Sequence, residues 1–361
     1  MIYEVFNGPK SEFEKRLPTE KILTLSSLVR IISPKEEFVP EVEANYEALV
    51  IFSDEYSGVA DFFIEGFLTY SSLYAKILGY EKIIMQNPPA KVKQQLASIK
   101  ESKFVQIHNY SYSNLKKRHL KKIKEDFEKI IFGQPKVKRE LLASLYSLTN
   151  KGTHKPTVIM LYGPSSVGKT ETAKLINSII NPTGQLFRKQ LSMFHNEKFM
   201  NYIFGDKSNS FAKDLLDRET NIILLDEFDK AHPMFYSAFY QLFDEGIYTD
   251  KYYEVCLENT IIFCTSNYLD EKEIRKSLGD PIYSRFDHFI SFNELEKEAK
   301  LSIIESIYDE EIKKFSKIDQ VLIQEKNIKE KLKEKVDSMR NAREIRKVMV
   351  QTMSYVLIEN L

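Results

Sequence analysis

Residues 157–170 read TVIMLYGPSSVGKT, an apolar run that leads into a glycine-rich segment. The segment fits G-x-x-x-x-G-K-[ST] at every fixed position, and a helix-like stretch follows it to about residue 180. Between a strand and a helix, the backbone N–H groups of such a loop surround phosphates, its lysine reaches the β- and γ-phosphates, and its threonine hydroxyl binds Mg²⁺. The stretch therefore predicts an α/β domain that binds a nucleoside triphosphate. The predicted binding residues are Gly163, Pro164, Ser165, Ser166, Val167, Gly168, Lys169, Thr170 and Glu171.

A second strand-like run ends in two adjacent acids. Residues 221–233 read NIILLDEFDKAHP, so that four apolar residues lead directly into Asp226 and Glu227. Neighbouring carboxylates at the edge of a core repel each other and are costly to desolvate, unless a cation or a reacting water needs them. Beside a phosphate loop, Asp226 is expected to hold Mg²⁺ together with Thr170, and Glu227 to polarise the attacking water. An acidic helix start is the alternative, but the long apolar run disfavours it.

The pattern of strands and helices continues on both sides of these motifs. NTIIFCTSN at residues 259–267 is a further apolar strand, and Asn267 at its tip is placed to bond the attacking water or the γ-phosphate. Taken alone, an asparagine at a strand end is usually a turn residue. LFRKQLS (186–192) and HFISF (288–292) complete five predicted strands. From residue 293 the chain is expected to be helical, apart from a short strand at 320–323.

The first third of the chain predicts a separate small α/β unit, residues 1–114. Apolar runs at 48–52, 82–85 and 104–108 alternate with helix-like stretches at 59–78 and 90–100, which favours parallel strands. Asp54 and Glu55 follow the first run and are expected to form an acidic loop rather than a metal site. No internal repeat is visible in the sequence.

A basic helix is predicted directly after this unit. In NLKKRHLKKIKEDFEKIIFGQ (114–134) apolar residues recur at helical spacing, Asn114 is placed to cap, and the other faces carry lysines and Arg118. A solvated surface is the default interpretation of such a face, and contact with nucleic acid or an acidic partner is the alternative.

The amino-acid composition limits the classes of function that fit this chain. The 361 residues contain 52 Lys plus Arg and 52 Asp plus Glu, and this neutral balance disfavours a chain that binds nucleic acid over its whole surface. Cys256 and Cys264 lie in predicted strands and are expected to be reduced core residues. No long apolar run occurs, and acids interrupt the first residues where a signal peptide would be apolar. We expect a cytoplasmic protein without a membrane partner.

Several of these motifs together resemble one family. LLDEFDKAHP (224–233), FYSAFYQLFDEGIYTD (235–250) and NTIIFCTSN, in this order, resemble the second ATPase module of the Clp unfoldases, within the AAA+ superfamily. The resemblance runs from about residue 115 to 361. It implies a large P-loop AAA+ domain with a parallel sheet (115–292), a helical C-terminal lid (293–361), ATP and Mg²⁺ as cofactors, ATP hydrolysis, and a homo-oligomeric ring, most often a hexamer.

The resemblance also assigns residues. IIFGQ (130–134) is similar to the family's entry motif on the adenine side, which implies Phe132, Gly133 and Gln134 as binding residues. GDPIYSRFDHFISF (279–292) implies that Arg285 is an arginine finger that acts on a neighbour's ATP. MRNAREIRKVM (339–349) implies that Arg343 is a sensor arginine, with Asn341 where the family usually has glycine.

Two departures from the family shape the functional hypothesis. The Gly-aromatic-Val-Gly pore loop is absent after residue 204, where the sequence reads GDKSNS (205–210), and residues 268–283 hold no match to the tripeptide that docks the Clp protease. The sequence therefore favours a ring ATPase that remodels or switches a protein partner, bound through residues 1–114, without threading it and without a Clp protease chamber. A nucleic-acid-engaging ATPase or an ATP-gated scaffold in a larger assembly are the alternatives.

Overall fold

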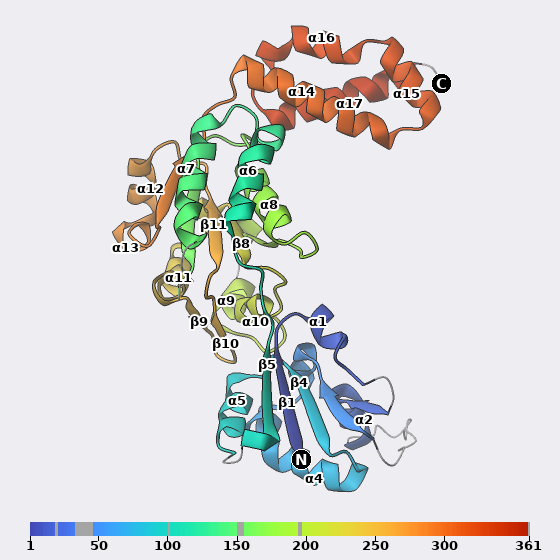
Figure 1. The fold of residues 1–361 in the computed structure, drawn as a ribbon, viewed down its shortest axis with the longest axis vertical. Coiled ribbons are helices and arrows are strands. Elements are labelled where there is room, and N and C mark those ends of the chain that lie inside the picture. Colours follow the sequence, from blue (N-terminus) through green and yellow to red (C-terminus); the bar gives the residue numbers. More distant parts are fainter. Residues whose placement is uncertain (19–20, 33–45, 100–101, 150–154, 194–196, 360–361) are drawn as a thin grey trace.

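The computed structural model describes residues 1–18, 21–32, 46–99, 102–149, 155–193 and 197–359. The molecule is elongated: a small α/β unit that holds the N-terminus lies at one end, a second α/β unit lies in the middle, and a group of helices near the C-terminus lies at the other end (Figure 1).

The N-terminal unit is built on a five-stranded parallel sheet in the order β2-β3-β4-β1-β5. The predicted strands at 48–52, 82–85 and 104–108 are confirmed as β3, β4 and β5, whereas the first two strands were not predicted. The strands are β1 (Ile2–Asn7), β2 (Ile22–Thr24), β3 (Ala48–Ile51), β4 (Lys82–Gln86) and β5 (Val105–Asn109). The helices are α1 (Lys10–Glu14), α2 (Leu25–Ile32), α3 (Asp61–Glu65), α4 (Phe67–Leu78) and α5 (Ala90–Ala97).

The middle unit contains a second parallel sheet, in the order β12-β6-β11-β8-β7. All five predicted strands of this sheet are confirmed. Every residue of β6, β8 and β11 is buried, as expected for central parallel strands covered by helices on both faces. The strands are β6 (Thr157–Tyr162), β7 (Phe187–Gln190), β8 (Ile222–Asp226), β11 (Ile261–Thr265) and β12 (His288–Ser291).

Two hydrophobic clusters cover the two faces of this sheet. One face carries α6 (Lys117–Ile130), α7 (Pro135–Tyr146) and α8 (Lys169–Ile180). The other face carries α10 (Phe211–Leu216), α11 (Pro233–Glu245), α12 (Glu271–Leu278) and α13 (Asp280–Tyr283), with α9 (Glu197–Phe204) and a hairpin of β9 (Ile247–Thr249) and β10 (Glu254–Cys256).

Two local predictions about the middle unit are wrong, and one hairpin was missed. Asn114 does not cap α6: the helix begins after Lys116, whose N–H donates to Nδ1 of His119 over 3.2 Å. The β9–β10 hairpin was not predicted. Cys256 lies in that hairpin and is exposed, so that only Cys264 is a core residue.

The C-terminal lid consists of α14 (Lys297–Glu311), α15 (Lys317–Glu325), α16 (Ile328–Glu334) and α17 (Ala342–Ile358). The strand predicted at 320–323 is wrong, because these residues lie in α15. That helix is capped by the Ser316 side chain, which accepts the Asp319 N–H. A short apolar run does not distinguish a strand from a helix, and here the capping hydrogen bond of Ser316 favours the helix.

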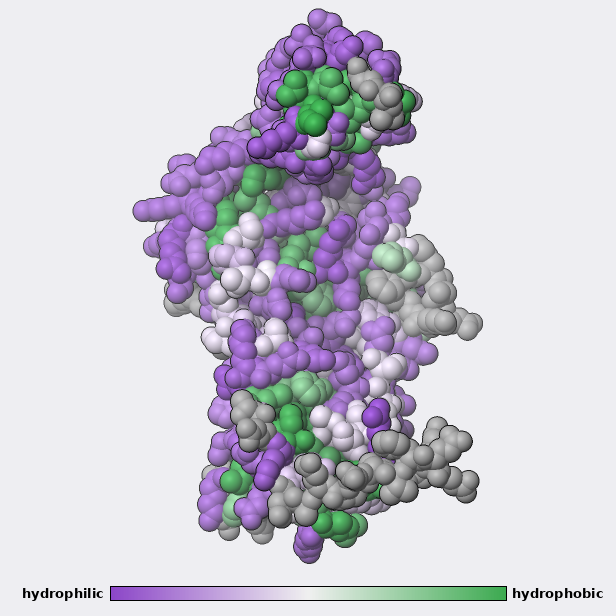
Figure 2. All heavy atoms as spheres, turned by 90° about the vertical axis from the view of Figure 1, so that its right-hand side faces the viewer, coloured by the Kyte–Doolittle hydropathy of each residue, from purple (hydrophilic) through white to green (hydrophobic). Residues whose placement is uncertain are grey.

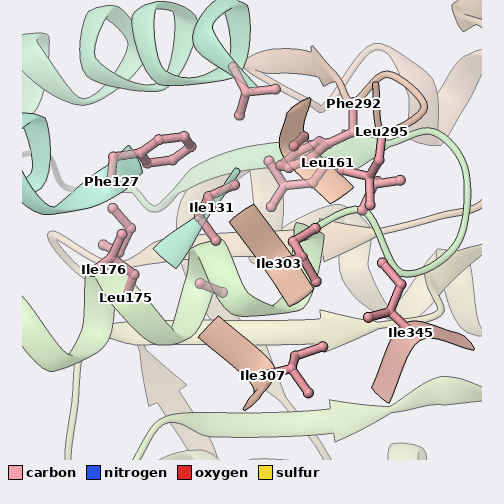
Figure 3. Close-up of a cluster of buried hydrophobic side chains, with 14 of the residues drawn as sticks. Phe127, Ile131, Leu161, Leu175, Ile176, Phe292, Leu295, Ile303, Ile307 and Ile345 are labelled. Carbon is pink, nitrogen blue, oxygen red and sulfur yellow. The ribbon is translucent and has the colours of Figure 1, made fainter. Parts of the chain in front are cut away.

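The lid and the middle unit share one hydrophobic core. Figure 3 shows Phe127 and Ile131 near Leu161 and Phe292, with Ile303, Ile307 and Ile345 of the lid in the same cluster. This core holds the lid over the carboxyl ends of the β6 and β8 strands, where ligands of open parallel sheets bind.

Hydrophilic residues cover much of the face seen in Figure 2, with apolar areas between them. Among the residues that the structure describes, no helix is long and apolar enough to cross a membrane.

Candidate nucleotide-binding site

A cavity of about 740 Å³ opens between the middle unit and the lid. Its walls are the end of α6, the loop between β6 and α8, the carboxyl ends of β8 and β11, and the facing sides of α14 and α17. This volume is within the range of small-molecule and cofactor sites, roughly 300–1,000 Å³.

The loop from Gly163 to Gly168 takes its shape from two glycines with positive φ. Gly163 has φ +130°, and a Cβ added there would lie 2.2 Å from the carbonyl oxygen of Phe292. Gly168 has φ +113° and directly precedes α8. Residues with side chains rarely adopt such angles, so both positions require glycine. The loop thereby directs the N-terminus of α8 into the cavity.

Lys169 is the first residue of α8, and its ammonium group turns back onto the loop. Its Nζ donates to the carbonyl oxygens of Gly163 (2.6 Å) and Pro164 (2.7 Å) and to Oδ1 of Asn267 (3.2 Å). Burial disfavours the charged form and lowers the pKa of Lys169 to about 8. The tips of β6 and β11 therefore meet at this lysine, so that Asn267 lies beside the phosphate loop.

Asp226 lies at the end of β8 in a network of three neighbours. Its Oδ2 pairs with Nη2 of Arg188 at 2.5 Å, the Thr265 hydroxyl donates to its Oδ1, and Oγ1 of Thr170 lies 3.3 Å from Oδ1. A hydroxyl and a carboxylate at this separation are the hard oxygen ligands that Mg²⁺ prefers. Sequence reasoning did not identify Arg188, because it meets Asp226 only through the pairing of β7 with β8.

Glu227 follows Asp226 in a left-handed conformation with φ 56°. Its N–H donates to Oγ1 of Thr265 over 2.9 Å, and its Oε2 accepts from Nε2 of Gln190 over 3.0 Å. Hydrogen bonds from Ser192 and Gln190 lower the pKa of the Glu227 carboxyl group. The side chain is therefore a carboxylate at neutral pH and can accept a proton from water.

Two buried polar atoms on the cavity wall are unsatisfied. Oδ1 of Asp229 and Oγ of Ser266 have no hydrogen-bond partner within the part of the chain that the structure describes. Buried polar atoms are rarely left unpaired, so these atoms fit a site whose ligand, metal or waters complete their bonds. Both residues belong to the wall that carries Asp226 and Asn267.

The lid contributes two arginines. Arg343 and Arg346 of α17 line the cavity, and Arg346 also pairs with Glu310 and Glu311 of α14. Sequence reasoning identified Arg343 and missed Arg346, which lies one helical turn further on. The cavity thus combines lysine and arginine cations at its rim with carboxylates at the ends of strands, the distribution that a metal-bound triphosphate needs.

The structure brings most of the predicted site residues to this cavity and leaves five outside its wall. The residues on the wall are Phe132, Ser165, Ser166, Val167, Gly168, Lys169, Thr170, Glu171, Asp226, Glu227, Asn267 and Arg343. Those outside the wall are Gly133, Gln134, Gly163, Pro164 and Arg285.

The residues outside the wall have other contacts. The Gln134 amide bonds both backbone groups of Asn293, and Gly133 packs closely on Ala299. Gly163 and Pro164 act through their carbonyl groups on Lys169. Arg285 donates to Asp244 over 2.8 Å and stacks over the ring of Tyr240.

Comparison with known proteins agrees with this geometry. Residues 154–337 match the family model described as "AAA domain (Cdc48 subfamily)". The chain is 24% identical over 268 residues to the chaperone protein ClpB of Malacoplasma penetrans (strain HF-2), a match that covers 66% of this chain and 38% of that protein.

It is also 29% identical over 173 residues to the ATP-dependent Clp protease ATP-binding subunit ClpL of Staphylococcus aureus (strain USA300), covering 42% of this chain and 25% of that protein. The chain thus spans less than half the length of these curated relatives. The matched region contains the phosphate loop, the acidic strand end and the arginine at 285. The chain belongs to the AAA+ ATPases of the Clp type.

Proposed function

We propose that this chain binds Mg·ATP in the cavity between the middle unit and the lid and hydrolyses it. The observation that carries the proposal is the convergence of Lys169, Thr170, Asp226, Glu227 and Asn267 at one end of one sheet. We also propose the domain boundaries 1–114, 115–292 and 293–361 for the partner-binding, large ATPase and lid domains.

Each residue has a distinct part in the proposed reaction. The ammonium group of Lys169 would exchange its bonds to loop carbonyls for the β- and γ-phosphates. Thr170 and Asp226 would hold Mg²⁺, which neutralises phosphate charge when bound. Glu227 would accept the proton of the attacking water, and Asn267 would orient that water or the γ-phosphate.

Assembly and output form the second part of the proposal. AAA+ ATPases of the Clp type commonly form rings, and we propose a homo-oligomeric ring in which Arg285 reaches the ATP of a neighbour. The ATP cycle would remodel or switch a protein partner held by residues 1–114, without classical threading and without a Clp protease chamber. The support is the short polar segment Gly205–Ser210, where Lys207 contacts the chain's own N-terminal unit instead of facing a substrate.

Two variants test the proposal. Lys169→Ala should abolish ATP binding or turnover, whereas Lys276→Ala, which removes an exposed lysine of α12, should leave both unchanged. Glu227→Gln should keep ATP bound but stop turnover, because an amide cannot accept a proton from water. A pull-down with ATP-loaded Glu227→Gln should then retain the protein partner. Wild-type turnover in either site variant would refute the assignment of the site.

A further inference from the structure

The two parallel sheets of this chain have the same strand order. Numbered within its own unit, each sheet runs fifth, first, fourth, third, second: β5-β1-β4-β3-β2 in the N-terminal unit and β12-β6-β11-β8-β7 in the ATPase unit. All neighbours are parallel in both sheets. Five strands can be ordered in many ways, so a shared order is a specific likeness.

The likeness extends to single backbone bonds beyond the strands. The residue after the fifth strand donates to the last residue of the first strand in both units: Tyr110 N–H to Asn7 O and Phe292 N–H to Tyr162 O, each 2.8 Å. The first strand is followed by Gly-Pro in both units. A Cβ added to Gly8 would meet Tyr110, just as one added to Gly163 would meet Phe292.

Two further bonds match around the fourth strand. The residue after it donates to the penultimate residue of the first strand: Asn87 N–H to Phe6 O at 2.9 Å and Ser266 N–H to Leu161 O at 3.0 Å. In both units, the side chain of the last residue of the fourth strand accepts a hydrogen bond. The donor is a backbone N–H just after the end of the third strand. Gln86 accepts from Ser53, as Thr265 accepts from Glu227.

The N-terminal unit lacks the nucleotide chemistry at these matched positions. Only Gly8 and Pro9 connect its first strand to α1, where the ATPase unit has the whole phosphate loop. By the strand registers, Phe52 and Ser53 take the places of Asp226 and Glu227. Neither matched position therefore carries an acid that could hold a metal or polarise water. Lys10 is the first residue of α1, as Lys169 is of α8, but no phosphate loop precedes it and its ammonium group lies 3.7 Å from Asp54.

A loop of the ATPase unit covers that end instead. Oδ1 of Asp217 accepts the Lys10 N–H (2.7 Å) and Nε2 of Gln86 (2.9 Å), and the Ser11 hydroxyl donates to Glu219 over 3.1 Å. Lys10 is the first residue of α1, so its N–H has no acceptor within the helix. The carboxylate of Asp217 thus lies at the end of the first and fourth strands of the N-terminal sheet. In the ATPase unit, the corresponding end of the sheet carries the phosphate loop.

Ion pairs surround this contact. Nζ of Lys213, a largely buried side chain of α10, pairs with Asp54 at 3.0 Å, and Lys207 pairs with Asp61 and donates to the Val59 carbonyl. Figure 1 shows the N-terminal unit placed end to end with the ATPase unit, with α1 and α10 near the junction. The Asp217 loop leads directly into β8, the strand that ends in Asp226.

We infer that the described part of residues 1–114 forms a second copy of the ATPase α/β fold, which lacks the phosphate loop and the two acids of the nucleotide site and uses the corresponding end of its sheet to hold the ATPase unit through Asp217. This docked copy holds in place the loop that precedes the acidic strand β8. The inference about docking does not depend on the proposed ATP hydrolysis, because none of its contacts involves a residue of the cavity wall.

Amide hydrogen exchange of the full-length chain tests the docking. Asp217→Ala should speed exchange at the Lys10 amide by about tenfold, the effect of losing one hydrogen bond to a charged acceptor. Exchange in β6 and β11 should stay unchanged, and so should the Lys10 amide in the control Glu245→Gln, whose partner Gln241 lies within α11. Should Asp217→Ala not fold, Gln86→Ala and Ser11→Ala remove the partner groups from the other side. Wild-type exchange at Lys10 in folded variants overturns the docking.

Nucleotide stoichiometry tests the missing site. Titration of the full-length chain with a non-hydrolysable ATP analogue should give one bound nucleotide per chain, and Lys169→Ala should give none. A nucleotide that remains bound in Lys169→Ala, and is lost on substitution of Lys10, would overturn the inference. Failure of the proposed hydrolysis would instead appear as bound nucleotide without turnover.

Discussion

At the residue scale, the ammonium group of Lys169 is held by several hydrogen bonds. Three oxygens hold its ammonium group, yet burial lowers its pKa to about 8, well below the usual value for a lysine. A lowered pKa means that the folded protein disfavours the charged form. This cost to the free energy of unfolding is fully present below about pH 8. It declines as the pH rises from the pKa of the folded chain to the higher pKa of lysine in the unfolded chain. Lys169 therefore makes the nucleotide-free protein relatively more stable at alkaline pH.

Nucleotide affinity should therefore fall as the pH rises through about 8, because a neutral Lys169 no longer attracts phosphate. Bound phosphates favour the charged lysine and raise its pKa, so binding above this pH should take up a proton. Calorimetric titration with ADP at several pH values, in two buffers of different ionisation enthalpy, measures both effects. An affinity that is constant across this range, with no proton uptake, would contradict the assignment.

The phosphate loop could be predicted because its residues are contiguous and all its chemistry is local to residues 163–170. Arg188 and Gln190 could not be predicted, because they meet Asp226 and Glu227 only when β7 pairs with β8. Gln134 was predicted to bind the cofactor because it belongs to the segment that resembles the family's entry motif. In the folded chain its amide instead bonds Asn293, a partner 159 residues away.

At the scale of elements, Gln134 connects the start of α7 to the segment that leads into the lid. Its Nε2 donates to the Asn293 carbonyl over 2.9 Å, and the Asn293 N–H donates to its Oε1 over 3.2 Å. Gln134→Ala should lower the free energy of unfolding by about 2 kcal/mol, since it leaves backbone groups unpaired at a buried position. Urea unfolding of the nucleotide-free chain measures this loss.

The same variant distinguishes a structural role of Gln134 from a role in binding. Because its amide lies outside the cavity wall, ADP affinity should change much less than stability does. Glu140→Gln, which alters an exposed ion pair with Lys136 on the same helix, is the matched control and should affect neither quantity measurably. If Gln134→Ala has normal stability but a large loss of ADP affinity, the result would support the prediction that Gln134 binds the cofactor.

Element type was predictable where a buried strand contains at least four consecutive apolar residues, as in β6, β8 and β11. The central strand β1 was missed because its residues, IYEVFN, include a glutamate and an asparagine. Glu4 of β1 pairs with Lys82 of the neighbouring β4 at 2.7 Å, a compensation that only the paired strands reveal. For the same reason the shared strand order of the two units was invisible in the sequence.

At the scale of the whole molecule, Arg285 lies outside the cavity of its own chain and pairs with Asp244. If it acts on a neighbour's ATP, Arg285→Ala should bind ATP normally and hydrolyse it poorly, by a factor of about 10³ or more. Mixing it with Glu227→Gln should restore part of the activity. The mixed interface pairs an intact Glu227 with an intact Arg285 from the next subunit.

The control for this experiment is the co-assembly of the two variants, shown by pull-down with different tags. Each variant alone should stay inactive at every protein concentration. Co-assembled subunits that show no rescue would argue that each chain completes its own site.

The output of the ATP cycle also belongs to the whole molecule. An unfoldase pulls on its substrate with exposed aromatic pore residues, whose large and stiff side chains give contact area. Here Tyr202 and Phe211, which flank the segment 205–210, are buried in the core, whereas Phe204 directly before it is 45% exposed. Lys207 within the segment contacts the N-terminal unit. These contacts of Lys207 support the proposal that the segment does not grip a substrate.

We accordingly predict ATP hydrolysis without processive unfolding of a stable folded protein. A tagged, stable fluorescent protein, presented with the chain, ATP and an isolated Clp protease chamber, should keep its fluorescence. A Clp unfoldase serves as the positive control for the assay, and the Lys169→Ala chain as the ATP-independent baseline. Under the same conditions ATP should change particle size or the hold on a partner, measured by light scattering and pull-down. Loss of fluorescence at the rate of the positive control would show that segment 205–210 grips substrate despite its polar sequence.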